Sequence, residues 1–161
     1  IAVGIALRRR DGPLATEAKP LLAALVVSIA LFGAGGLVGF LIRGSDVRIP
    51  AHYHGAIVGV TIAMMGLAYW LLPRLGAAAP RPRLAVAQSL LYGTGQLMHV
   101  AGLLWSGGYG VQRNVAGGEQ VLRSAGEIAG MGLMGLGGLV AVAGGVLFVV
   151  VVALAVRDRP R

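Results

Sequence analysis

The chain has 161 residues, of which 57% are hydrophobic and 12% are charged, and its mean hydropathy is +0.80. Soluble domains carry about a quarter of their residues as charged side chains, so this composition predicts an integral membrane protein. The absence of cysteine excludes disulfides and thiolate chemistry, which leaves histidine as the best ligand for a borderline metal. The net charge of +8 does not indicate a nucleic-acid partner, because the basic residues lie between apolar runs and not along one face.

Apolar runs divide the chain into expected helices. Residues 1–7 are apolar and stop at three arginines, as the end of a preceding helix would. Residues 21–42 contain no charge over 22 positions, enough at about 1.5 Å per residue to cross a hydrocarbon core of about 30 Å. Three further spans of comparable or greater length are expected: 51–72, 84–105 and 128–156. The expected fold is therefore an all-α integral membrane protein with four transmembrane helices.

Basic residues are distributed unevenly over the connections. With four spans, both termini and residues 73–83 share one side, which carries ten lysines and arginines, whereas the other side carries four. By the positive-inside bias, the ten-charge side is cytoplasmic. We therefore expect both termini in the cytoplasm and the start of the second span near the outer surface.

Two of the three histidines, His52 and His54, stand one residue apart at the start of the second span. On an α-helix, positions i and i+2 point about 200° apart and differ in height by about 3 Å. These two imidazoles cannot ligate one metal from a single helix. They can each hold a separate cofactor on opposite sides of it, and neutral imidazole is a good axial ligand for haem iron.

Several stretches, in order, resemble subunit I of the haem-copper oxidases. Ala51-His52-Tyr53-His54 resembles the Ala-His-Phe-His motif on the tenth of that subunit's twelve core helices. Residues 32–39 are similar to the Phe-x-x-Gly-Gly-Leu-x-Gly of the ninth helix, and residues 98–104 to the His-x-Ala-Gly-Leu-Leu of the eleventh in divergent members. The connection between Gly39 and His52 lacks the His-Asp pair of many members, which favours a divergent branch. The resemblance implies a fragment comprising core helices nine to twelve.

The resemblance also implies roles for individual residues. His52 would be the proximal ligand of the high-spin haem, His54 one axial ligand of the low-spin haem, and Tyr53 would lie between the two haems. Arg113 stands where the family has the first arginine of Gly-x-Pro-Arg-Arg, whose arginines bind haem propionates. Asn114 replaces the second arginine, so this clamp is weaker or is completed elsewhere.

Two other polar residues have structural interpretations. His99 can reach the haem layer, but a hydrogen bond to backbone or to a neighbouring helix is the expected role of a single membrane histidine. Glu127 stands at a predicted helix start, where a negative charge is favoured by the helix dipole, so it is expected to cap that helix.

The implied function is that of the C-terminal third of the catalytic subunit of a terminal respiratory oxidase. Such an enzyme reduces oxygen to water with electrons from cytochrome c or quinol and couples this to proton transport. It contains two haems and a copper ion whose ligands lie on earlier helices, outside this chain. The expected partners are the remainder of subunit I, the other oxidase subunits and the lipid of a bacterial-type inner membrane.

Two alternatives stay open at this point. Nitric oxide reductases belong to the same superfamily and share the His-x-His arrangement. A cofactor-free membrane interaction subunit could instead pack on a larger complex through small-xxx-small glycine pairs, which occur at 35 and 39, 55 and 59, and 126 and 130.

Overall fold

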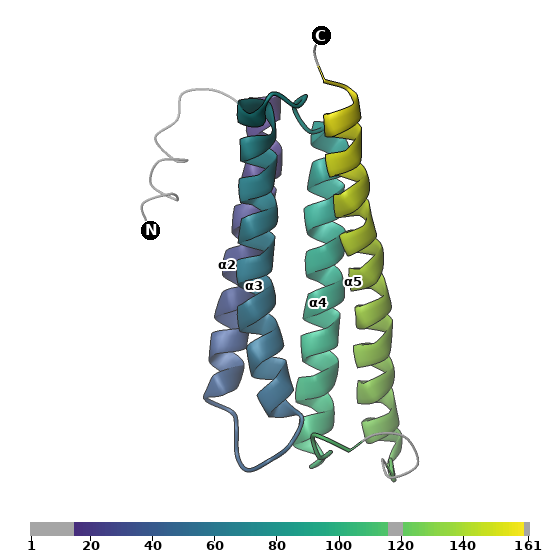
Figure 1. Cartoon of the computed structure of the whole chain (residues 1–161). Helices are drawn as coiled ribbons and strands as arrows, with labels where there is room; N and C mark the ends of the chain where they lie inside the picture. The colour runs from purple at the N-terminus through teal and green to yellow at the C-terminus, as the bar shows by residue number, and fades with distance from the viewer. Residues whose placement is uncertain (1–14, 116–120, 160–161) are drawn as a thin grey trace.

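A computed structural model describes residues 15–115 and 121–159, and its regular structure over these residues is helical. The expected helix at residues 1–7 lies outside the described residues. The elements in chain order are η1 (Thr16–Ala18), α2 (Lys19–Gly39), α3 (Arg48–Leu71), η2 (Leu72–Leu75), α4 (Pro82–Gly108) and α5 (Ala125–Arg157). The four long helices run side by side and alternate in direction (Figure 1).

Three of the four expected spans are confirmed as helices long and apolar enough to cross a membrane. Their bounds, with the adjoining 3-10 turns, are Thr16–Gly39, Arg48–Leu75 and Ala125–Arg157. The helix expected over 84–105 is present as α4, but it does not reach the same hydropathy. Polar side chains occur along α4, namely those of Gln88, Ser89, Thr94, Gln96 and His99. A fourth membrane span therefore stays a prediction.

Helix ends follow local chemistry. α3 gives way to a 3-10 turn with Pro73 in its first positions, and Gly76 closes that turn at φ +79°, a backbone conformation that favours glycine. At the start of α5, Ser124 and Glu127 form a reciprocal capping box, which confirms the expected capping role of Glu127. α4 continues to Gly108, three residues beyond its expected end.

Glycine contacts pack the four helices as two close pairs, α2 with α3 and α4 with α5. Between α2 and α3, a Cβ on Gly55 would lie 2.6 Å from the Gly35 Cα. Between α4 and α5, a Cβ on Gly130 would lie 3.0 Å from the Ser106 nitrogen, and one on Gly137 would lie 2.6 Å from the Gly95 oxygen. Both pairs therefore approach backbone to backbone, as small residues allow in membrane helices.

The end of the bundle that carries the α2–α3 and α4–α5 connections is called here the histidine end, since His52 and His54 lie beside it (Figure 1). The two connections are joined there. The Val47 N–H donates to the Val111 oxygen at 3.0 Å, and Asp46 pairs with Gln112 in an isolated antiparallel bridge. An apolar cluster lies beneath this join, formed by Val38, Val47, Ala51, Val100, Leu103 and Val111.

Candidate haem-ligand site

His52 and His54 lie in the second turn of α3 and turn to different neighbours. His52 faces α2, where its Nδ1 is 2.8 Å from the Gly35 oxygen. His54 faces α4, where its ring centroid is 4.9 Å from that of His99. The helical spacing thus has the consequence expected of it, and the two imidazoles occupy different sides of one helix.

The His52 imidazole has a fixed tautomer. A carbonyl oxygen can only accept, so the contact with Gly35 places the proton on Nδ1 and leaves a lone pair on Nε2 in the neutral ring. This contact exists because α2 and α3 approach closely at Gly35 and Gly55. Gly39 adds the space that the ring needs, since a Cβ there would lie 3.0 Å from the His52 Nδ1. Three glycines therefore set the position of this side chain.

The His54 imidazole is held by its own helix. Its Nδ1 lies 2.9 Å from the oxygen of Pro50, four residues earlier, so Nδ1 again carries the proton and Nε2 the lone pair. The ring of Tyr53 lies 5.0 Å from that of His54, centroid to centroid, and the tyrosine is exposed.

His99 repeats the same arrangement from α4. Its Nδ1 lies 3.0 Å from the oxygen of Met134 on α5, and its ring is tilted 39° from that of His54. All three histidines of the protein thus donate from Nδ1 to a backbone carbonyl. All three keep an unprotonated Nε2 in the neutral ring.

These residues fit the haems that the resemblance implies. Over residues 15–115 and 121–159 there is no cluster of three or more His, Cys, Asp or Glu side chains that could enclose an ion. Haem iron does not need one, since the porphyrin occupies four positions and the protein supplies only axial ligands. An imidazole whose Nδ1–H is held by a carbonyl, with Nε2 as the donor atom, is the usual form of a metal-ligating histidine. His52 and His54 both have this form.

Arg113 lies in the α4–α5 connection at the histidine end. Its Nε donates to the Ser45 hydroxyl at 3.1 Å, and the side chain is exposed. Asn114 beside it has a φ of +63°. The structure thus brings Arg113 to the same end of the bundle as His52 and His54, tied to the α2–α3 connection.

An ion pair between Asp46 and Arg48 lies at the histidine end. Asp46 accepts from the Arg48 backbone N–H at 2.8 Å and from its Nε at 2.9 Å, and the Asp46 side chain is only 9% exposed. The Arg48 guanidinium holds the pKa of the Asp46 carboxyl below its usual value of 3.8. The backbone of Gly107 lies against this pair, since a Cβ there would lie 2.5 Å from the Arg48 Cγ.

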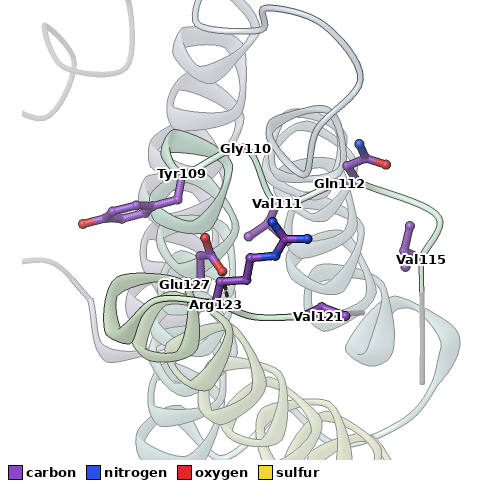
Figure 2. Close-up of a pocket in the computed structure, with 8 residues that line it drawn as sticks. All are labelled: Tyr109, Gly110, Val111, Gln112, Val115, Val121, Arg123 and Glu127. Atoms are coloured by element: carbon purple, nitrogen blue, oxygen red, sulfur yellow. Dashed lines mark hydrogen bonds between the residues drawn. The ribbon is translucent and has the colours of Figure 1, made fainter. Parts of the chain in front are cut away.

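A cavity of about 400 Å³ opens at this end, and it is lined by residues of the α4–α5 connection and by Glu127 of α5 (Figure 2). Its wall also includes Arg123, whose backbone N–H donates to the Glu127 carboxylate at 2.5 Å. No histidine lines it. The cavity is therefore separate from the imidazoles.

Comparison with known proteins identifies the family. No protein-family model matches the chain. Over 84 residues it is 32% identical to cytochrome c oxidase subunit 1 of Thermus thermophilus, and the match covers 47% of this chain and 78% of that protein. The chain belongs to the haem-copper oxidase superfamily. A haem-copper terminal oxidase, solved by cryo-EM as a dimer, has the same fold over 95% of this chain, with a TM-score of 0.76 and 19% identity.

Two further relatives of this superfamily member are uncharacterised. A protein of Rickettsia prowazekii is 37% identical over 136 residues, which cover 78% of this chain and 26% of that protein. A protein of Aquifex aeolicus is 40% identical over 52 residues, covering 32% of this chain and 14% of that protein. The chain thus spans about a quarter of the first relative, and 29% of the solved oxidase chain.

Some of the residues that surround this site could be named from the sequence, but the groups that hydrogen-bond to the His52 and His54 rings could not. His52, Tyr53, His54 and His99 were named from residue type and motif, and the structure places the rings of Tyr53 and His99 beside that of His54. The backbone acceptors of His52 and His54 were not predicted, because any residue has a carbonyl, whereas the expected hydrogen bond of His99 to a neighbouring helix is confirmed by its contact with Met134. The glycine spacing at 35 and 39 was the available signal for the α2 side.

Proposed function

We propose that this chain is the C-terminal part of the catalytic subunit of a terminal respiratory oxidase. His52 would supply the proximal ligand of the high-spin haem and His54 one axial ligand of the low-spin haem. The observation that carries this proposal is the paired geometry at the start of α3. Two imidazoles, each with Nδ1 held by a backbone carbonyl, lie on different sides of one helix, His52 against α2 and His54 against α4.

The surrounding residues orient these ligands. The Gly35 carbonyl holds the His52 ring against α2, and the Pro50 carbonyl holds the His54 ring against its own helix. Such hydrogen bonds fix the tautomer, restrict the orientation of the ring and raise the basicity of the ligating nitrogen. When bound, the two haems would supply electron transfer and oxygen chemistry, while Tyr53 stands between the two ligands on the same helix.

The remaining features of the whole enzyme belong to the same proposal. Oxygen would be reduced to water with electrons from cytochrome c or quinol, with coupled proton transport, and the copper ligands would lie outside this chain. The other partners would be the rest of subunit I and the other oxidase subunits. In the sequence, lysine and arginine are more numerous on the side predicted to lie opposite the histidines, which supports a cytoplasmic location for that side in a bacterial-type inner membrane.

The test is a pair of ligand substitutions in the full-length protein, purified with its partner subunits from membranes. His54→Leu is expected to remove the low-spin haem band from the reduced visible spectrum. His52→Leu is expected to perturb the high-spin haem and abolish oxygen consumption. Tyr53→Phe, which restores the residue usual in the family motif, should keep both haems and serves as the control. An unchanged low-spin band in His54→Leu would refute the assignment.

The same preparation separates the two alternatives. A nitric oxide reductase-like member would retain both haems but consume nitric oxide in place of oxygen. A cofactor-free interaction subunit would purify without haem.

A further inference from the structure

We propose that His99 is a positioning residue that sets the plane of the His54 imidazole. The inference rests on the proposed role of His54 as a haem ligand and adds a third histidine to it. Its basis is the contact between the two rings, whose centroids are 4.9 Å apart with planes tilted by 39°. This separation lies within the range of centroid distances at which aromatic rings attract one another.

A second contact is needed because the first does not fix the plane of the His54 ring by itself. The hydrogen bond from Nδ1 to Pro50 limits rotation about the Cβ–Cγ bond, but hydrogen bonds tolerate a broad range of angles. Tyr53 touches the same ring, with a centroid distance of 5.0 Å, but its side chain is 43% exposed. His99 is therefore the contact with a fixed support behind it.

The position of His99 is itself fixed by the close packing of α4 on α5. Its Nδ1–H donates to the Met134 oxygen at 3.0 Å. Gly137 lets the helices meet at this level, since a Cβ there would lie 2.8 Å from the Met98 carbonyl carbon. Gly138 lies beside the ring, since a Cβ there would be 3.5 Å from the His99 Nδ1. The orientation of α4 on α5 is thus transmitted through His99 to a ring on α3.

Histidine combines two properties at this site. It has a flat ring to lie against His54 and, at the same ring, an N–H donor for the Met134 carbonyl. Phenylalanine keeps the ring and loses the donor, whereas glutamine keeps a donor and loses the ring. The three substitutions Phe, Gln and Ala therefore separate stacking from anchoring.

The readout is the electronic structure of the low-spin haem. The plane of an axial imidazole controls how the iron d orbitals split, so rotation of that plane shifts the g values of the ferric low-spin signal without removing the haem. Electron paramagnetic resonance and the reduced visible spectrum would be recorded on the full-length assembly. The variants are His99→Phe, His99→Gln and His99→Ala, with Thr94→Ala as the control, because Thr94 is exposed on the same helix.

We expect wild-type haem content in all four variants. The largest shift of the low-spin g values should occur in His99→Ala and His99→Gln, a smaller one in His99→Phe, and none in Thr94→Ala. Unchanged g values in His99→Ala and His99→Gln would overturn the inference. Loss of the low-spin haem in His99→Phe would also overturn it, since His99 would then be acting as a ligand. If His99→Ala does not assemble, His99→Phe and His99→Gln decide by the same criteria.

Failure of this inference differs from failure of the proposed function. If His54→Leu removes the low-spin haem and the His99 variants keep wild-type g values, the proposed function stands and the positioning role is wrong. If His54→Leu retains the low-spin haem, the proposed function fails as well.

Discussion

Gly35 of α2 and Gly55 of α3 touch through their backbones, and a Cβ on Gly55 would lie 2.6 Å from the Gly35 Cα and 2.9 Å from its nitrogen. This contact places the Gly35 carbonyl within 2.8 Å of the His52 Nδ1. The packing of α2 on α3 and the hydrogen bond that orients the His52 ring therefore depend on the same pair of small residues.

Gly55→Ala is the direct test of that dependence. The added methyl group meets backbone atoms of α2, which cannot rotate away, so the helices must separate and the His52 hydrogen bond lengthens. Overpacking of this kind typically costs about 1–3 kcal/mol. We expect a lower melting temperature of the detergent-solubilised assembly and a perturbed high-spin haem spectrum.

Gly36→Ala is the matched control, because among the described residues a Cβ there has no atom within 4 Å outside the adjoining backbone of its own helix. Alanine is favoured over glycine inside a helix by up to about 1 kcal/mol. This variant should melt at or above the wild-type temperature. Equal effects of the two substitutions would show that the close approach at Gly55 does not matter.

The long helices were predictable from sequence because an apolar run of about 20 residues admits few structures. Their ends were less so. α4 was expected to stop before Ser106, since glycines at 107 and 108 weaken a helix, but it continues to Gly108. Gly107 is buried and lies against Arg48 and Asp46, so tertiary packing outweighs the helix propensity of glycine there.

The different directions of the His52 and His54 side chains were predictable from the sequence, while their role as haem ligands stays a prediction. Spacing on a helix requires His52 and His54 to point apart, and they do. The partner of each ring was not predictable, since it depends on which helices pack together. His99 stands 45 positions after His54 in the chain, and only the crossing of α3 with α4 brings the two rings into contact.

Replacing the side-chain amide of Gln88 or of Gln96, both on α4, should have different effects on the stability of the protein. Gln88 is fully buried and accepts from the Tyr69 hydroxyl at 3.0 Å. Gln88→Leu leaves that hydroxyl unpaired, which typically costs about 1–3 kcal/mol. Gln96 has a buried Oε1 with no hydrogen-bond partner among the described residues, so Gln96→Leu removes an unsatisfied group and should be neutral or stabilising.

Thermal unfolding of the two purified variants checks this contrast. The double variant Tyr69→Phe, Gln88→Leu should lie closer to wild type than Gln88→Leu alone, because replacing both partners leaves no unpaired group. A Gln96→Leu variant less stable than Gln88→Leu would contradict the hydrogen-bond assignment.

The Asp46–Arg48 pair should make the stability of the histidine end depend on pH. Arg48 lowers the pKa of Asp46 in the folded protein below its usual 3.8. A depressed folded pKa gives stability that is fully present above the unfolded value and is lost as pH falls through the folded one. Asp46→Asn should therefore be less stable than wild type at neutral pH, and the difference should shrink below about pH 4.

Asp158→Asn is the matched control at the other end of the bundle. Asp158 pairs with Arg81, but the two side chains are 38% and 55% exposed, and exposed ion pairs contribute little to stability. Melting temperatures measured from pH 3 to 8 should separate the two variants. A constant offset of Asp46→Asn across the whole range would show that its charge is not responsible.

Arg113 offers the last test, which depends on the proposed function. Its guanidinium lies at the histidine end and donates from Nε to the Ser45 hydroxyl, and a nearby haem propionate would gain from its positive charge. Arg113→Gln should lower the midpoint potential of the haem it serves, because removal of a positive charge disfavours the electron-rich reduced state. Ser45→Ala removes the hydrogen bond but keeps the charge, so its potential should stay close to wild type. Redox titration of the purified assembly measures both. A larger shift in Ser45→Ala than in Arg113→Gln would mean that the connection between the two loops, and not the charge of Arg113, governs the potential.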